Sequence, residues 1–150
     1  MHAEPIDKTD KNIINMLAKD GRLSYRKISQ KAGVSVVTVM NRVRRLEKGG
    51  IIKGYSVVMD YPSLGYDLEA LIEVRVSKGK LFDVENLIAA RRNVFSVYDV
   101  TGNFDVAIVA KFQNRRQLDE FVKYLQTIPN VTRTHTRLIL NTVKEASFEI

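Results

Sequence analysis

Two short helical segments joined by a tight turn, between Ser24 and Gly50, constrain the fold of this chain most. Ser24 can cap the first segment, because its hydroxyl can accept a hydrogen bond from a free backbone N–H of the first turn. Gly33 ends this segment, at a position that requires a positive φ. Ser35 caps the second segment, which ends at Gly49-Gly50. This arrangement is typical of a helix-turn-helix unit.

The second segment is expected to be a helix with one apolar and one polar face. Its apolar residues recur at steps of three and four positions, and they are Val36, Val39, Val43 and Leu46. This stripe is needed for packing against other helices, so the opposite face is available for a partner. The opposite face carries Val37, Thr38, Asn41, Arg42, Arg44, Arg45 and Lys48.

The positive charge of the chain is concentrated in the same part of the sequence. Residues 1–60 hold twelve Lys/Arg and six Asp/Glu, a net charge of +6, whereas residues 61–150 hold twelve and eleven, a net charge of +1. A basic excess confined to one domain favours a polyanion, because neutralising phosphates releases counterions. A membrane surface is a weaker alternative, because the apolar stripe is used in packing. A basic face that is merely solvated is the second alternative.

The rest of the N-terminal half predicts one further helix and a strand. A helix over residues 9–19 precedes the pair described above, and alternation of apolar and polar residues over 55–59 predicts a strand. Turn-forming residues at 60–65 mark the best domain boundary. We therefore expect a DNA-binding domain over 1–54, a connecting strand and hinge over 55–66, and a second domain over 67–150.

The second domain is expected to be a single antiparallel sheet with two helices. The predicted strands cover 68–76, 94–101, 105–112 and 131–140, and the predicted helices cover 81–91 and 115–128. The order strand, helix, strand, strand, helix, strand matches a ferredoxin-like βαββαβ sheet with both helices on one face. The other face would be open, and a second subunit is its usual cover. The fold class is therefore α+β.

Several classes of function are disfavoured by composition. The chain has no cysteine, which excludes disulfides, thiolate chemistry and cysteine-based zinc sites. No run of about 20 apolar residues could cross a membrane. The N-terminus lacks the apolar core of a signal peptide, so a cytoplasmic location is expected. His2 and His135 are the only histidines, so we expect no metal, no cofactor and no enzymatic activity.

Residues at fixed spacings along nearly the whole chain indicate a family. In the N-terminal part they are Asp7, Asp10, Ile14, Leu17, Asp20-Gly21-Arg22, Ser24, Ile28, Gly33, Ser35, Val39, Arg42-Val43, Leu46-Glu47 and Gly50-Ile51-Ile52. In the C-terminal part they are Leu64-Gly65, VTGNFD at 100–105, IPNV at 128–131 and Thr134-His135-Thr136. With these residues the chain resembles the Lrp/AsnC (feast/famine) transcription regulators. Ser29 is a departure, because the family often has Ala there.

The resemblance implies a fold, partners and a ligand. The family fold is a winged helix-turn-helix domain followed by a βαββαβ effector domain. Members form homodimers through the effector domains and commonly assemble into octamers. They bind double-stranded promoter DNA, and many sense a small amino acid between subunits, near the loop at 102–105.

Contacts to DNA can be divided into those to bases and those to phosphates. Val37, Thr38 and Asn41 are the candidates for base edges, because they lie opposite the packing stripe near the start of the reader helix. The candidates for phosphates are Ser24, Tyr25, Arg26, Ser35, Arg42 and Arg45. Arg44 could contact a phosphate, pair with Glu47 or face solvent. A two-fold dimer would place two readers about 34 Å apart on a roughly palindromic site.

An amino-acid ligand needs donors for its carboxylate and an acceptor for its ammonium. The Gly102-Asn103 turn exposes backbone N–H groups that suit a carboxylate. Asp99 and Asp105 are possible ammonium partners. The remaining candidates around this effector site are Tyr98, Thr101, Phe104, Thr134, His135 and Thr136. An ordinary polar hairpin is the alternative, because Gly-Asn is good turn chemistry.

Two other functions are compatible with the same domain order. A ligand-free architectural protein could compact DNA around a disc of subunits. Relatives of this two-domain shape decarboxylate a tetrapyrrole, but the basic reader helix and the scarcity of histidines argue against that enzyme here. The leading hypothesis is a sequence-specific regulator whose DNA binding or assembly responds to a small amino acid.

Overall fold

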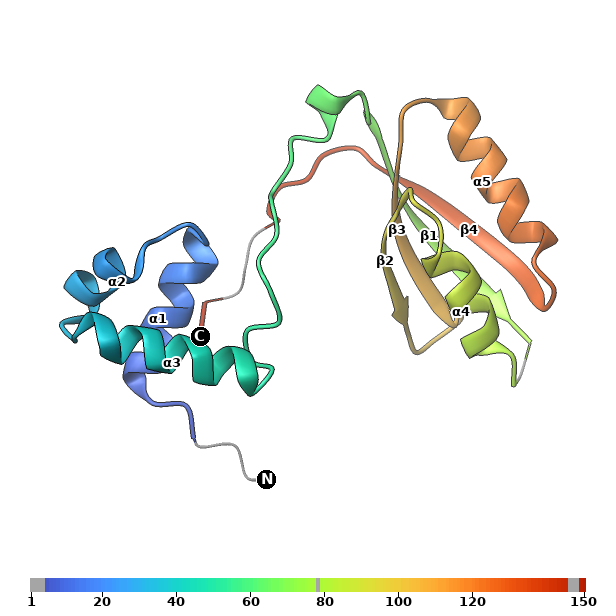
Figure 1. Ribbon diagram of the computed structural model, residues 1–150. Coiled ribbons are helices and arrows are strands. Elements are labelled where there is room, and N and C mark those ends of the chain that lie inside the picture. Colours follow the sequence, from blue (N-terminus) through green and yellow to red (C-terminus); the bar gives the residue numbers. More distant parts are fainter. Residues whose placement is uncertain (1–4, 78, 146–148) are drawn as a thin grey trace. The chain divides into compact units, whose positions relative to one another are not determined.

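The computed structural model describes residues 5–77, 79–145 and 149–150, and the chain divides into two compact units (Figure 1). The first, here called the reader unit, comprises Met1–Val58 together with Lys144–Ile150. The second, here called the effector unit, comprises Met59–Val143. The C-terminal segment therefore belongs to the reader unit, which the sequence did not indicate. The side-chain amide of Asn15 exchanges hydrogen bonds of 2.8 and 3.0 Å with the backbone of Ile150.

The reader unit is built from three helices, α1 (Lys8–Lys19), α2 (Tyr25–Ala32) and α3 (Val36–Lys48). The expected caps are confirmed: the hydroxyls of Ser24 and Ser35 accept hydrogen bonds of 3.3 and 3.0 Å from the third backbone N–H of α2 and α3. Gly33 ends α2 with a φ of 67°. The helices enclose a core of Ile13, Leu17, Ile28, Val39 and Val43.

Two expectations for the reader unit are wrong. Val36 was assigned to the packing stripe, yet it is 44% exposed, because it opens α3 ahead of the first residue that meets the core. The strand predicted at 55–59 is not formed, and the backbone of residues 53–60 belongs to no helix or strand. A strand needs a neighbouring strand to satisfy the hydrogen bonds of its backbone groups, and alternation of apolar and polar residues does not by itself supply one. The Tyr55 hydroxyl instead donates a hydrogen bond of 3.1 Å to Glu47.

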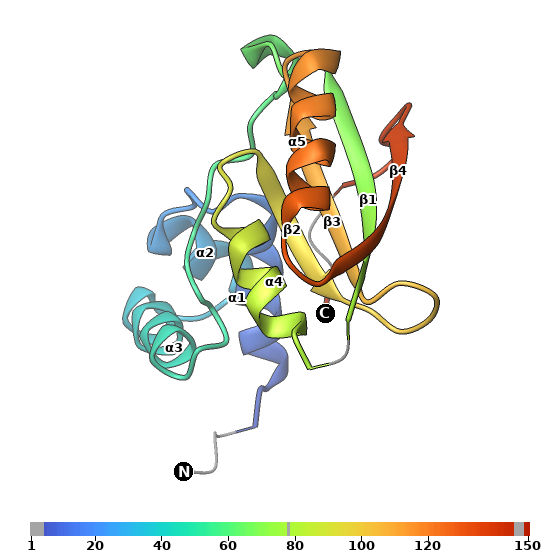
Figure 2. The same ribbon diagram turned by 90° about the vertical axis from the view of Figure 1, so that its right-hand side faces the viewer.

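The effector unit confirms the predicted ferredoxin-like order. The strands are β1 (Leu68–Val76), β2 (Val94–Asp99), β3 (Val106–Phe112) and β4 (Val131–Ile139), and the helices are α4 (Leu81–Ala89) and α5 (Arg115–Thr127). A short 3-10 helix, η1, covers Pro62–Leu64. The strands form one antiparallel sheet in the order β2-β3-β1-β4. Figure 2 shows α4 and α5 side by side on one face of the sheet.

The register of the sheet fixes which side chains face the helices. Ile72 of β1 lies opposite Ile108 of β3 and Thr136 of β4, and this row faces α4 and α5. The adjacent residue, Glu73, lies opposite Ala107 and His135, and this row faces the other side, here called the open face. The helix-covered face is apolar and buried over β1 and β3 and becomes polar at its edges, whereas the open face mixes charged and apolar side chains.

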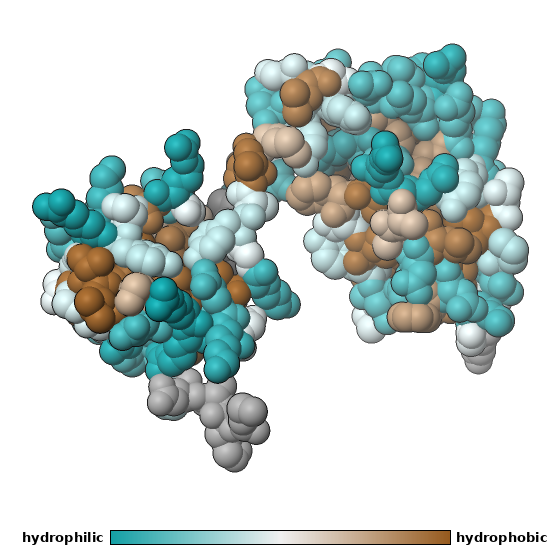
Figure 3. All heavy atoms as spheres, in the orientation of Figure 1, coloured by the Kyte–Doolittle hydropathy of each residue, from teal (hydrophilic) through white to brown (hydrophobic). Residues whose placement is uncertain are grey.

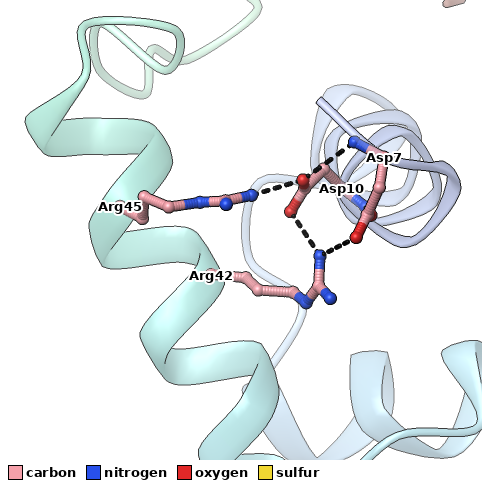
Figure 4. Close-up of polar contacts among 4 residues, drawn as sticks. All are labelled: Asp7, Asp10, Arg42 and Arg45. Atoms are coloured by element: carbon pink, nitrogen blue, oxygen red, sulfur yellow. Dashed lines mark hydrogen bonds and ion pairs between the residues drawn. The ribbon is translucent and has the colours of Figure 1, made fainter. Parts of the chain in front are cut away.

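A cluster of two carboxylates and two guanidinium groups joins α1 to α3 (Figure 4). Asp7 and Asp10 form a capping box at the start of α1, with hydrogen bonds of 2.8 and 3.1 Å to each other's backbone N–H. Arg42 of α3 donates to Asp7 at 2.6 Å and to Asp10 at 3.0 Å, and Arg45 donates to the other oxygen of Asp10. Asp10 is fully buried, while the two arginine side chains are 27% and 37% exposed.

This arrangement keeps both aspartates ionised. Burial by itself would raise the pKa of Asp10, but hydrogen bonds from the Asp7 backbone, Arg42 and Arg45 outweigh burial and lower the pKa below 3.8. The pKa of Asp7 is also lowered, first by its hydrogen bond from the Asp10 backbone N–H and then by Arg42. The buried charge of Asp10 is therefore fully compensated by donors from both helices.

We expect Asp10→Asn to destabilise the reader unit strongly. The substitution leaves two arginines facing a neutral amide, and breaking a buried ion pair costs roughly 3–5 kcal/mol, with partly exposed arginines lowering this to about 2–3 kcal/mol. Urea unfolding monitored by circular dichroism measures the change. Glu145→Gln, which removes an exposed carboxylate of the same unit, is the control and should change stability by less than about 0.5 kcal/mol. Equal stability of the two variants would contradict the role of Asp10.

The same cluster predicts a dependence of stability on pH. A carboxyl whose pKa is lowered on folding contributes stability above its unfolded pKa, and this contribution is lost as the pH falls through the folded pKa. The difference in unfolding free energy between the native protein and Asp10→Asn should therefore be constant above about pH 5 and shrink below 3.8. A difference that stays constant from pH 7 to pH 3 would mean that ionised Asp10 is not what stabilises the unit.

Candidate nucleic-acid interface and effector loop

The exposed face of α3 presents a compact set of candidate recognition groups. Val37 is 60% exposed, and Asn41 and Arg44 are also exposed. Thr38 is only partly exposed, and its hydroxyl lies 2.8 Å from that of Ser35, so the hydroxyl is engaged at the helix cap. Val36 joins Val37 on this surface, and neither valine has a packing role within the unit. Apolar side chains here suit thymine methyl groups, and an asparagine suits an adenine edge.

Sequence reasoning did not place Val36 on the exposed face of α3. The three- and four-residue spacing placed it on the packing stripe, but the spacing does not say where along the stripe the neighbouring helices end. The core of the reader unit includes Val39 and Val43 of α3, and Val36 lies one turn before Val39.

The predicted phosphate contacts divide into two groups. Ser24, Tyr25 and Arg26 are exposed at the start of α2, and Ser35 is exposed at the start of α3. These positions stay candidates, because helix starts combine backbone N–H groups with the positive end of the helix dipole.

Arg42 and Arg45 form the second group, and the structure gives them a different role. Both bind Asp10, as described above, so they hold α1 against α3. The charge pattern alone could not reveal this, because Asp10 lies more than thirty residues before its partners. Any loss of DNA binding on replacing these arginines would also reflect a weakened reader unit.

Arg44 is the clearest phosphate candidate on α3. The pair with Glu47 that the sequence left open is not formed, since the Glu47 carboxylate accepts a hydrogen bond from Tyr55. Among the residues that the structure describes, no ion pair involves the Arg44 guanidinium, and the side chain is exposed. Four further basic residues, which the sequence did not single out as contacts, are exposed on α2 and α3 or just beyond α1. They are Arg22, Lys27, Lys31 and Lys48.

The loop at 102–105, between β2 and β3, is fastened to the end of β1. The Asp105 carboxylate accepts a hydrogen bond of 2.8 Å from the backbone N–H of Val76, and it lies 3.9 Å from the Arg75 guanidinium. Arg75 also donates a hydrogen bond to the backbone carbonyl of Asn103. Asp105, proposed as an ammonium partner, therefore already holds the loop in place. Gly102 has a φ of 118°, and a Cβ there would meet no atom within 4 Å.

The remaining predicted effector residues lie on both faces of the sheet. Tyr98 and His135 face the open side, in the row of Glu73. Asp99, Thr134 and Thr136 face the helix-covered side, in rows that include Val74 and Ile72. A single chain does not gather the predicted set around one hollow, and a site that uses both faces would need a further subunit.

Two residues of the predicted set do meet. The Phe104 and His135 rings stack with centroids 6.0 Å apart and planes 24° from parallel. His135 lies 3.2 Å from the carboxylate of Glu73, which also receives Arg137 at 3.1 Å. Sequence reasoning missed Glu73 and Arg137, because only the register between β1 and β4 brings them beside His135.

The described part of the chain holds neither a cluster of metal-ligating side chains nor a membrane-spanning helix. In residues 5–77, 79–145 and 149–150, no group of three or more His, Cys, Asp or Glu side chains could hold a metal ion. Over the same residues, no helix has the length and apolar character needed to cross a membrane.

Comparison with known proteins also distinguishes an N-terminal from a C-terminal part of the chain. Residues 6–53 match a family described as winged helix-turn-helix DNA-binding, and residues 69–147 match the Lrp/AsnC ligand binding domain. The chain is 41% identical over 140 residues to a Pyrococcus abyssi protein described as an uncharacterized HTH-type transcriptional regulator, covering 93% of this chain and 95% of the relative. It is 35% identical over 143 residues to the HTH-type transcriptional regulator FL11 of Pyrococcus horikoshii, covering 95% of both.

Solved structures match over nearly the whole chain. The transcriptional regulator NMB0573 of Neisseria meningitidis, solved as a complex with L-Met, superposes with a TM-score of 0.89 at 25% identity and 95% coverage of both chains. AsnC of E. coli, at 24% identity and a TM-score of 0.90, covers 97% of this chain and 99% of its own and shares the fold. These matches also argue against the decarboxylase alternative. The chain belongs to the Lrp/AsnC family and is a DNA-binding transcription regulator with a ligand-binding domain.

Proposed function

We propose that this regulator recognises specific DNA sequences with α3, and that a small amino acid at a subunit interface of the effector unit modulates its DNA binding or assembly. The observation that carries the first part is the exposed face of α3, where Val37, Asn41 and Arg44 have no packing role. A helix that is packed on one side and offers an amide, methyl groups and a guanidinium on the other suits a major groove.

Contacts to phosphates supply affinity without sequence preference. We assign this role to Arg44 and to Ser24, Tyr25, Arg26 and Ser35 at the two helix starts. We assign Arg42 and Arg45 first to the structure of the reader unit, because their guanidinium groups neutralise a buried carboxylate.

The open face of the effector unit supports assembly into a homodimer. Its strands carry half-buried apolar side chains, including Leu71 and Val109, and no helix among the described residues covers them. Figure 3 shows hydrophobic side chains at the surface of both units. A second copy of this chain is the proposed cover, and further association of dimers, up to an octamer, is proposed from the family. Two readers in a dimer would recognise a roughly palindromic site with half-sites about 34 Å apart.

The loop at 102–105 is the proposed place of the amino-acid effector. Gly102 leaves open space beside backbone N–H groups, which suits a carboxylate. NMB0573, a relative of the same fold, was solved with L-Met, so a free amino acid is a ligand chemistry found on this architecture. The division of the predicted residues between two faces favours a site completed by another subunit.

We expect Arg44→Gln and Asn41→Ala to weaken DNA binding in different ways. Arg44→Gln should weaken binding to every sequence and reduce the slope of log K against log salt by about 1, as for a phosphate contact. Asn41→Ala should cost about 1–3 kcal/mol on the preferred site only and relax specificity at one base pair. Fluorescence anisotropy on a specific and a scrambled duplex, at several salt concentrations, separates the two effects.

Arg116→Gln, an exposed arginine of the effector unit, is the control for loss of one positive charge. Binding that falls equally for Arg116→Gln and Arg44→Gln, with no sequence preference in the native protein, would contradict reading by α3. That outcome would favour the ligand-free architectural alternative.

We expect Gly102→Leu to abolish the effector response while leaving ligand-free DNA binding unchanged. Calorimetric titration of the twenty amino acids, with the mass of the assembly followed in parallel, identifies the effector in the native protein. Gly79→Leu is the matched control, because Gly79 has a φ of 78° and equally open surroundings in another loop. An effector response that survives Gly102→Leu would remove this loop from the site, and no binder at millimolar concentration would support the architectural alternative.

A further inference from the structure

We propose that the effector unit contains a second small-molecule site, at the end of the sheet opposite the loop at 102–105, and that it binds an α-amino acid. The site is a hollow of about 330 Å³ between the start of β2, the end of β3 and the first turns of α5. Its lining combines aromatic rings, two guanidinium groups and one carboxylate. These are the groups that a zwitterion with an apolar side chain requires.

The floor of the hollow is aromatic and rigid. Phe112 and Phe121 are 1% and 5% exposed, and their ring centroids lie 5.5 Å apart. Phe112 closes β3 and Phe121 belongs to α5, so the floor is part of the core that the sheet shares with its helices. A preformed apolar floor binds an apolar side chain without reorganisation.

The rim on one side is the connection between α4 and β2, and it supplies the cations. The Arg91 guanidinium lies 4.1 Å from the centre of the Tyr124 ring, which holds it by a cation–π contact. The backbone of this rim is fixed by a hydrogen bond of 3.1 Å from Val94 N–H to Arg91 and one of 2.9 Å from Lys111 N–H to Asn93. Arg92 is exposed and makes no ion pair with any described residue. A guanidinium with unused donors suits a carboxylate.

The rim on the other side is α5, and it supplies the anion. Glu120 lines the hollow and is exposed, and the cations that act on its carboxylate belong to the same helix: Arg116 at 3.7 Å and, electrostatically, Lys123. Gln117 also lines the hollow, but its amide is occupied by reciprocal hydrogen bonds of 3.0 Å with Gln113. The groups left for a ligand are therefore the two arginines on one rim and Glu120 on the other. This polarity matches a ligand carboxylate beside the arginines and a ligand ammonium beside Glu120.

A neighbouring hollow of about 280 Å³ continues the site. It shares Tyr66, Arg92 and Asn93 with the first hollow, and its other walls include the Tyr61 and Phe95 rings, which meet edge to face at 6.2 Å. The buried Lys111 beside these rings is neutralised by Glu69 at 2.8 Å, so it does not compete for the ligand carboxylate. The second hollow offers mainly apolar surface and reaches the open face at Lys111, which the proposed homodimer covers, so the first hollow is the ligand site proper.

The proposed site and the loop at 102–105 lie at opposite ends of the same two strands. Val94 pairs with Ala110 at the end beside the hollow, and Asp99 pairs with Val106 at the end beside the loop. Five residue steps of an extended strand separate them by roughly 15–20 Å. A ligand in the hollow therefore contacts none of the residues proposed for the effector at the loop.

Titration calorimetry on the full chain, with L-phenylalanine as the probe, tests the proposal. Its side chain fits an aromatic floor, and two analogues each lack one charge: 3-phenylpropanoate has no ammonium, and 2-phenylethylamine has no carboxylate. We expect L-phenylalanine to bind at millimolar concentration or below, and each analogue to bind at least tenfold more weakly. Arg92→Gln and Glu120→Gln should each weaken L-phenylalanine binding at least tenfold without changing the melting temperature, since both side chains are exposed.

Two control variants make the result specific. Arg115→Gln removes an exposed arginine at the start of α5 that does not line the hollow, and it should leave binding unchanged. Repeating the titrations in the Gly102→Leu background removes any contribution of the loop. L-phenylalanine should still bind in that background, and adding Arg92→Gln should weaken this remaining binding at least tenfold, so this proposal can fail or succeed independently of the proposed function. No binding of L-phenylalanine, equal binding of the analogues, or binding that is lost with Gly102→Leu but kept with Arg92→Gln would overturn the proposal.

Discussion

A buried carboxylate organises the reader unit. Asp10 has no exposure to solvent, and its charge is balanced by the Asp7 backbone and by two arginines of α3. Without those donors the carboxylate would have to be neutral or the helices would have to separate. The angle and position of α3 against α1 are therefore set by an ion pair as well as by apolar packing. Because Arg42 and Arg45 turn toward Asp10, the residues of α3 that stay exposed include Asn41 and Arg44.

The effector unit depends on a different constraint, the register of β1 in the centre of the sheet. Because neighbouring residues of a strand face opposite sides, the pairing of Ile72 with Ile108 places Glu73 on the open face. This single register creates a buried, helix-covered face and an open face that carries His135 and Arg137. The length of the β2–β3 pair separates its two ends, so the loop at 102–105 and the hollow beside Phe112, the two proposed ligand sites, share no residue.

Much of the architecture could be predicted from the sequence because it depends on local signals. Serine caps, a glycine with positive φ and helical spacing located α2 and α3, and the order of elements gave the ferredoxin-like sheet. The strand predicted at 55–59 failed because a strand is a property of a pair, and the described chain provides no neighbour for it. The assignment of Val36 to the packing stripe was wrong for a related reason. Helical spacing identifies which face of a helix is apolar, but not how far along that face the neighbouring helices extend.

The sequence by itself determined the family, the order of the helices and of the strands in the sheet, the reader helix and the position of the glycine loop, because these follow from short-range patterns and fixed spacings. Only the tertiary structure decided what individual charges do. Asp10 lies far in sequence from Arg42 and Arg45, and only the folded chain reveals that the three form an ion-pair cluster. Glu120 lies far in sequence from Arg91 and Arg92, and only the folded chain reveals that they line one hollow. A charge acquires its role from the groups that surround it in space, and helix packing and strand register set those surroundings.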